Sequence, residues 1–282
     1  MPIRPPCAEQ FYQGDCKAQI EAFRKGFTPP AMPGRVVAGV VPHAGWFFSG
    51  DTAAKVFLTI KAKQTPRTFI LLGAVHVQGV WHNSVYDSGG WDTPLGEVRV
   101  DPDTARYLLD NLPGILTADS NAHRYEHSIE VQTPIIKYLF PEAMVVPIAV
   151  PPGKDAVALG EGIGRIVKEG AVDAVVVGTT DLTHYGDSYG FSPAGTGKKA
   201  HEWMLGNDRR MIDLALRMEY NDILREALTH RNACGSGALA ATVAAAKEMG
   251  AGGGHLLQYT TSYDVHPFGE FDMAVGYAGI VY

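Results

Sequence analysis

The sequence predicts an α/β fold, namely a three-layer α/β/α sandwich around a central mixed sheet. Apolar runs of strand length recur along the chain and alternate with longer segments that carry helical start signals. The runs at 35–41, 68–73, 144–150 and 173–178 are rich in Val, Ile and Leu. Strands of that kind are buried on both faces, which requires a layer of helices on each side of the sheet.

Six apolar runs are predicted to form the strands, and the last of them is expected to lie centrally in the sheet. They are residues 35–41, 68–73, 144–150, 173–178, 256–263 and 273–282.

Four helices are predicted from the residues at which they begin. Asp51 is expected to cap the first, and Asp101 followed by Pro102 opens the second. Asp155 lies near the start of the third, and Ser236 precedes the fourth. These starts predict helices over residues 51–63, 101–112, 156–170 and 237–249.

The alternation is not interrupted by a repeat, a low-complexity tract or an obvious linker, so we expect a single domain over residues 1–282. Residues 77–98 contain many Trp, Gly and Tyr residues and little periodicity. That segment is predicted to form a loop or an irregular hairpin over a cleft.

Composition narrows the class of partner. The formal net charge is −6 and no basic run is present, which argues against nucleic acid and against a polybasic membrane contact. We expect a small-molecule substrate or a peptide instead. The N-terminal residues lack a signal-peptide pattern and no apolar stretch is long enough to cross a bilayer, so a cytoplasmic location is expected. Three cysteines without CxxC spacing indicate neither a disulfide framework nor a zinc ribbon.

Three metal-ligand residues stand on glycine-containing turns beside apolar runs: His43, His76 and Cys234. If they converge, they form an open metal site. Each has a simpler interpretation, because a lone His at a strand end often bonds a loop carbonyl and a lone Cys is often an inert buried thiol. Cys234 lies just before a predicted helix start, which is expected to lower its thiol pKa and favour a thiolate ligand or nucleophile.

A second group of candidates lies in NAHRYEHSIEVQTP. If residues 128–140 are helical, His127 and Glu130 share one face and could bind a common ligand or each other. The alternative is a cap made by Ser128 or His127 and completed by Glu130. Pro134 allows this helix only if it kinks there or if its first turn begins late.

A third group, Asp181 and His184, follows the run at 173–178. Asp181 is expected either to fix the tautomer of a histidine or to cap the turn, and His184 to act as a general acid or base. Either residue alone is often structural. Because so many groups of ligand or acid/base type occupy predicted strand ends, we expect one shared crevice.

These residues lie within a series of short motifs that resembles the Memo family over essentially the whole chain. The motifs are, in order, FYQGD, VPHAGWFFSG, LLGAVH, WDTPLGEV, EHSIEVQTP, TTDLTHYG, ACGSGAL, YTTSYDV and VGYAGIVY. The Memo fold is similar to that of class III extradiol ring-cleaving dioxygenases of the LigB type. LLGAVH carries Ala74 and Val75 where relatives usually have Pro and Ser, which changes no ligand.

The resemblance implies that His43, His76 and Cys234 bind the metal, with Cys234 in place of the dioxygenase carboxylate. His184 matches the acid/base histidine, His127 matches a second histidine of the substrate pocket, and Asp181 would lie behind them. Iron(II) is the expected metal, with copper or zinc as alternatives.

The expected function is therefore that of a metal-dependent, dioxygenase-like redox enzyme. Radical SAM and AMMECR-type proteins are the partners that microbial relatives imply. Eukaryotic relatives suggest an alternative, a non-enzymatic module that binds phosphorylated or anionic peptides in the same cleft. A third interpretation is a hydrolase with Cys234 as nucleophile and His184 as base.

Overall fold

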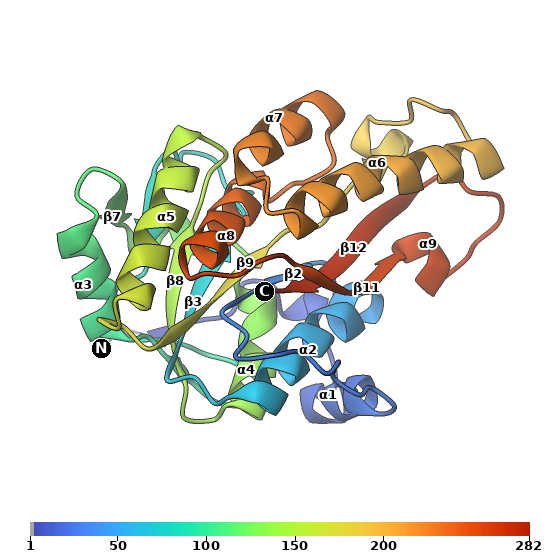
Figure 1. The fold of residues 1–282 in the computed structure, drawn as a ribbon. Coiled ribbons are helices and arrows are strands. Elements are labelled where there is room, and N and C mark those ends of the chain that lie inside the picture. The colour runs from blue at the N-terminus through green and yellow to red at the C-terminus, as the bar shows by residue number, and fades with distance from the viewer. Residues whose placement is uncertain (1–2) are drawn as a thin grey trace.

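The computed structural model describes residues 3–282 and arranges them in three layers, with a mixed sheet between two layers of helices (Figure 1). The large sheet has the spatial order β10 (His184–Tyr185), β12 (Ala274–Val281), β2 (Ala38–Val41), β9 (Ala174–Thr179), β3 (Thr68–Gly73), β8 (Met144–Ala149), β4 (Asn83–Val85) and β7 (Leu116–Ala118), with β11 (His255–Thr261) paired to β12. A small second sheet contains β1 (Ile3–Arg4), β5 (Gly90–Trp91) and β6 (Val98–Arg99). The predicted three-layer α/β/α class is confirmed.

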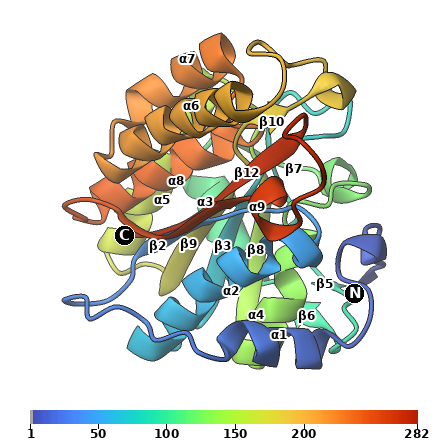
Figure 2. The ribbon, with the colours of Figure 1, turned by 90° about the vertical axis from the view of Figure 1, so that its right-hand side faces the viewer.

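Helices cover both faces of the large sheet (Figure 2). The helices whose buried side chains share one core with the sheet are α3 (Pro102–Asn111), α5 (Lys154–Lys168), α6 (Lys198–Leu216), α7 (Tyr220–His230) and α8 (Ser236–Glu248). The helices of the opposite core are α1 (Cys16–Arg24), α2 (Trp46–Lys63) and α4 (Thr133–Leu139). A short helix, α9 (Ser262–Val265), follows β11.

All six predicted strands are present, and each boundary lies within three residues of the expected one. Strands β2, β9, β3 and β8 are parallel neighbours, whereas β12 runs antiparallel to β2 and β4 antiparallel to β8. β12 is internal, although it lies next to the edge strand β11. Because parallel strands end at the same edge of a sheet, the turns after β2, β9 and β3 meet there.

The helix α8 can approach the sheet and α5 closely because small residues face one another. A Cβ added to Gly160 of α5 would lie 2.1 Å from the carbonyl oxygen of Ala241 in α8. A Cβ on Gly178 of β9 would lie 2.0 Å from Thr242 Oγ1. This contact fixes the N-terminus of α8, and therefore the turn that carries Cys234, against the end of β9.

Three of the four predicted helix starts are confirmed. The Asp101 side chain accepts a hydrogen bond from the Thr104 amide at the start of α3, Asp155 lies in the first turn of α5, and α8 begins at Ser236. The prediction for Asp51 is wrong.

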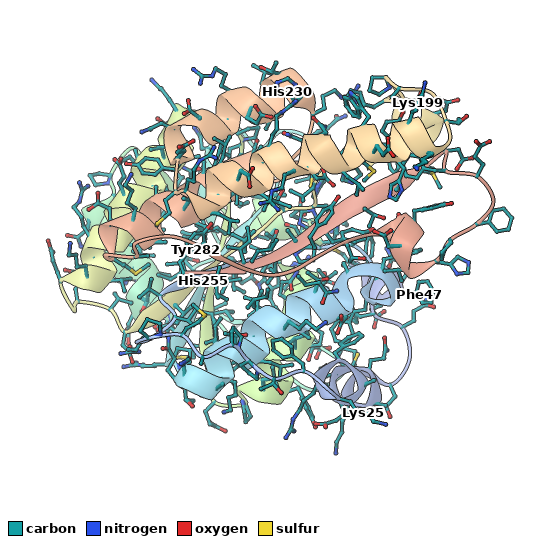
Figure 3. The ribbon with its side chains drawn as sticks, turned by 45° about the vertical axis from the view of Figure 1, so that its right-hand side comes forward. Lys25, Phe47, Lys199, His230, His255 and Tyr282 are labelled. Carbon is teal, nitrogen blue, oxygen red and sulfur yellow. The ribbon has the colours of Figure 1, made fainter. Side chains whose placement is uncertain are left out.

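The helix α2 begins at Trp46, with Gly45 as its N-cap, and Phe47 projects from its first turn (Figure 3). The apolar residues before Asp51 extend the helix toward the N-terminus. Asp51 instead accepts a hydrogen bond from Lys55 Nζ at 2.7 Å, one turn later.

Other parts of the chain were predicted incompletely. Residues 77–98 are irregular for most of their length, but they also supply β4 to the large sheet and β5 to the small one. Helices α1, α6 and α7 were not predicted. The helix α4 begins late, at Thr133, so that Pro134 falls in its first turn, where no amide hydrogen is needed.

Among residues 3–282, no helix has both the length and the apolar character that crossing a bilayer requires.

Candidate metal centre

The candidate site lies at the edge of the sheet where β2, β9 and β3 end. His43 follows β2, Asp181 follows β9, and His76 follows β3. Cys234 comes from the turn immediately before α8. The predicted convergence of His43, His76 and Cys234 is present, since their ligand atoms all lie within 4.8 Å of one another.

Three imidazole rings share this space. The ring centroids of His43 and His76 are 5.0 Å apart, and those of His43 and His127 are 5.6 Å apart, both edge to face. His76 and His127 stack with centroids 4.7 Å apart. His43 Nε2 lies 3.2 Å from Cys234 Sγ. The group therefore presents imidazole nitrogens and a sulfur to one small volume.

His43 is held from two sides. Its Nδ1 lies 2.9 Å from Thr179 Oγ1, so Nε2 is the ring atom that faces Cys234. Its backbone amide donates to Asp181 Oδ1 at 2.7 Å. Burial, together with the neighbouring His76 and His127, holds the pKa of His43 well below its usual value. A neutral imidazole is the form that binds a metal.

His76 is held by Glu126, a residue that the sequence interpretation missed. Glu126 Oε1 lies 3.0 Å from His76 Nδ1, and Oε2 accepts the backbone amide of His76 at 2.5 Å. Burial opposes charge on both groups. Their mutual hydrogen bond and attraction are stronger, so the pKa of His76 is raised and the pKa of Glu126 is lowered to about 2. The signal was present in the sequence, because Glu126 directly precedes His127.

Cys234 does not have the lowered pKa that its place before α8 suggested. Desolvation by the surrounding protein raises the pKa of the thiol, and the charge of Asp181 raises it further. The hydrogen bond of the sulfur to the carbonyl oxygen of Asp181, at 3.6 Å, places an acceptor where a thiolate would need a donor. Burial thus outweighs the helix terminus, and the prediction of a lowered thiol pKa is wrong.

His127 and Glu130 do not form the predicted pair. His127 stacks on Phe11 with centroids 4.7 Å apart, and its Nδ1 lies 3.6 Å from Glu126 Oε1. Glu130 instead binds the N-terminal segment. Its carboxylate accepts Arg4 Nη1 and Tyr12 Oη, both at 2.7 Å.

The capping alternative is also wrong. The short 3₁₀ turn Glu130–Gln132 has Ile129 as its N-cap, and no side chain caps it. Arg4 also donates from Nη2 to the Glu126 carbonyl oxygen at 2.9 Å. The N-terminal segment therefore anchors the turn that carries both Glu126 and His127.

Asp181 and His184 are also neighbours of His43. Asp181 is buried, which raises its pKa, while the charges of His184 and other groups oppose the rise. Asp181 accepts a hydrogen bond from the backbone amide of His43. The orientation of the His43 ring is fixed by Thr179, and that of the His76 ring by Glu126. His184 Nδ1 lies 3.1 Å from the Leu182 carbonyl oxygen, and its ring meets Tyr189 edge to face.

Comparison with known proteins identifies the family of this chain. The family model described as Memo-like protein matches residues 4–281. A MEMO1 family protein of Thermococcus onnurineus is 37% identical and one of Pyrococcus furiosus is 36% identical, each alignment covering 99% of this chain and 98% of the relative. The crystal structure of the uncharacterized protein JW3007 from Escherichia coli K12 matches with a TM-score of 0.53 at 12% identity, over 87% of this chain and 99% of that one, which bears on the fold alone. The chain belongs to the Memo family.

Proposed function

We propose that this protein is a metal-dependent redox enzyme in which His43, His76 and Cys234 bind a divalent transition metal. Iron(II) is our first choice and copper our second, with zinc as a further candidate. The observation that carries the proposal is that the three ligand atoms lie within 4.8 Å of one another.

The donor set fits such an ion. Donors about 2.0–2.3 Å from a common ion lie roughly 3.5 Å from one another, so only small adjustments are needed. Both histidines have their second ring nitrogen occupied, by Thr179 and Glu126, as metal-bound histidines commonly do. An iron(II) ion held by three protein donors would supply redox and Lewis-acid chemistry with coordination positions left open.

The remaining residues of the site suit proton handling. His127 packs against His43 and His76, and His184 lies close enough to His43 to affect its pKa. We assign these two histidines to proton transfer and substrate orientation. Asp181 positions the His43 backbone through its 2.7 Å hydrogen bond. Phe11 stacks on the His127 ring.

Metal analysis of anaerobically purified protein tests the ligand assignment. We expect about one metal per chain in the wild type and in His255→Ala, which removes an exposed histidine of β11, and much less in His43→Ala and Cys234→Ala. Equal metal content in all four proteins would reject the proposal.

Oxygen consumption tests the enzyme assignment. We expect His184→Ala to keep its metal and lose turnover of small aromatic substrates. The rival function is recognition of an anionic peptide in the same cleft, without turnover. Peptide affinity that survives in His184→Ala, without turnover under any redox condition, would support the rival and overturn ours.

A hydrolase that uses Cys234 as nucleophile is a third candidate, and thiol alkylation that bound metal prevents would argue against it. We further propose a cytoplasmic role with radical SAM and AMMECR-type partners, which is supported by the family resemblance. Co-purification with such proteins from the native cell tests it, and their absence from the purified complex would count against it.

A further inference from the structure

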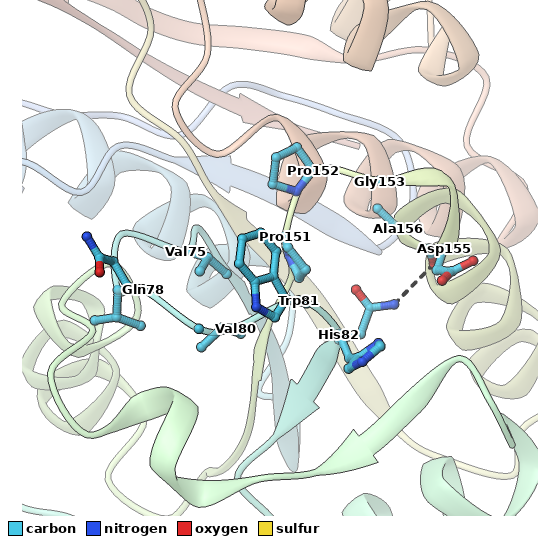
Figure 4. Close-up of a pocket in the computed structure, with 13 residues that line it drawn as sticks. Val75, Gln78, Val80, Trp81, His82, Pro151, Pro152, Gly153, Asp155 and Ala156 are labelled. Carbon is cyan, nitrogen blue, oxygen red and sulfur yellow. Dashed lines mark hydrogen bonds between the residues drawn. The ribbon is translucent and has the colours of Figure 1, made fainter.

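A cavity of about 670 Å³ lies between the segments that follow β3 and β8 (Figure 4). One wall is the loop after β3, including Val75, Val77 and Trp81, and the other is the segment from Pro151 through the first turn of α5. Val75 and Val77 flank His76 in the chain. Pockets that bind small molecules have volumes of this order.

The walls of the cavity are mostly apolar, and one large ring in them is uncovered. Trp81 is 80% exposed, whereas Trp46 and Trp91 are buried. The figure shows the Trp81 indole between the valines of its own loop and the prolines 151 and 152 (Figure 4). An exposed indole in an apolar wall provides a flat surface on which another aromatic ring can stack.

A fixed hydrogen-bond acceptor also faces the cavity. Asn83 lines it and is only 3% exposed. The Asn83 Nδ2 donates to the carbonyl oxygens of Ile115 at 2.9 Å and Asp155 at 3.2 Å, which fixes the orientation of the amide. Within residues 3–282, Asn83 Oδ1 accepts no hydrogen bond. This oxygen is not fully buried. Because Asn83 lines the cavity, the oxygen is accessible from there.

The charge at the cavity, like this acceptor, favours a ligand that donates a hydrogen bond. The exposed carboxylate of Asp155 lines it, and the described residues that line it include His82 but no lysine or arginine. An anionic ligand is therefore disfavoured, and a ligand that donates a hydrogen bond is favoured.

We propose that this cavity binds a planar aromatic molecule, uncharged or cationic, that stacks on Trp81 and donates an N–H or O–H hydrogen bond to Asn83 Oδ1. The inference rests on the proposed function in one respect: the bound ring would be the non-reacting part of the substrate, held against the loop that carries His76. Binding itself does not require the metal.

Ligand-observed NMR with two probes of matched shape tests the proposal on the full chain. Indole carries an N–H, and benzofuran has an oxygen in its place. We expect indole to bind at millimolar concentrations and benzofuran to bind about fivefold more weakly, the usual effect of one hydrogen bond. We expect Trp81→Ala to weaken indole binding about tenfold. The control Phe268→Ala removes an aromatic ring that is 84% exposed and does not line the cavity, and it should leave the affinity unchanged.

Absence of indole binding to the wild type would overturn the proposal, and so would equal affinity for the two probes. An unchanged affinity in Trp81→Ala, or an equal loss in Phe268→Ala, would overturn it as well. The metal content of each variant is measured in parallel. If Trp81→Ala keeps the metal content of the wild type but binds indole more weakly, the cavity assignment is supported. If instead the metal assignment alone is wrong, the wild type will still bind indole although it does not hold the expected metal.

Discussion

Glu126 holds His76 at two points, with one carboxylate oxygen 3.0 Å from the ring Nδ1 and the other 2.5 Å from the backbone amide. The same carboxylate accepts the Ser128 amide at 2.9 Å. One buried side chain therefore sets the ring orientation and the backbone position of a candidate ligand. The chain brings this partner from 50 residues away.

The first prediction concerns this carboxylate. Glu126→Gln keeps the shape but replaces the charge, so the His76 ring loses its anionic partner. We expect metal affinity to fall about 10- to 100-fold with the fold retained. Competition with a chelator of known affinity measures it. Glu142→Gln, at an exposed position, is the control, and equal affinities in the two variants would contradict the role of Glu126.

The second prediction concerns the close approach of Gly235 to β9. A Cβ added there would lie 2.2 Å from the Thr179 carbonyl oxygen, so Gly235→Ala must displace the turn that carries Cys234. We expect a loss of about 1–3 kcal/mol in the free energy of unfolding and lower metal content. Urea denaturation and metal analysis measure these changes.

Gly206→Ala is the matched control for that substitution. A Cβ at this helical glycine would meet nothing within 4 Å, and alanine favours helix. We expect this control to be stabilised by about 0.5–1 kcal/mol with its metal content unchanged. Equal stability and equal metal content in the two variants would show that the contact at Gly235 has no structural effect.

The third prediction concerns the buried ion pair of Arg4 and Glu130, whose side chains are 4% and 1% exposed. Arg4→Met leaves the carboxylate without its cation, and we expect a loss of about 3 kcal/mol in the free energy of unfolding. Arg35→Met is the control, because the ion pair of Arg35 with Asp173 is exposed and should cost less than about 1 kcal/mol.

Chemical denaturation of Arg4→Met, of Glu130→Gln and of the variant that combines them measures the coupling, with Arg35→Met as the control. The double variant should lose less stability than the sum of the two single changes. Strict additivity would mean that the two side chains do not stabilise each other.

The fourth prediction concerns Asp208 in α6, which accepts the Thr183 amide at 2.8 Å and Tyr259 Oη at 2.7 Å. Burial raises the pKa of this carboxyl from 3.8 to about 7. Because the pKa is higher in the folded state, the folded protein binds the proton more tightly. The resulting stability is fully present below about pH 4 and is lost as the pH rises through about 7.

Asp208→Asn has no such titration. Its stability relative to the wild type should therefore increase by about 2.5 kcal/mol between pH 5 and pH 8. Urea denaturation of both proteins across that range measures the difference, in which the titrations of all other groups cancel. A difference that does not vary with pH would contradict the raised pKa.

Much of the fold could be predicted because its signals are local. Strands such as Thr68–Gly73 are continuous apolar runs bounded by turns, and Asp101 with Pro102 is a helix start that neighbouring residues complete. Asp51 was misassigned because a capping residue type occurred inside a helix whose apolar pattern begins earlier, at Trp46. In that case the packing of the first turn outweighed the local preference of the aspartate.

The sequence by itself determined the order of strands and helices along the chain and the residue types at the strand ends, which brought His43, His76 and Cys234 under consideration. The tertiary structure alone decided that Glu126 and not Glu130 supports the histidines, and that Arg4 takes Glu130. It also decided that the thiol of Cys234 has a raised pKa. The physical reason is that hydrogen-bond partners and loss of water depend on which distant segments meet, whereas strand and helix signals depend on neighbours in the chain.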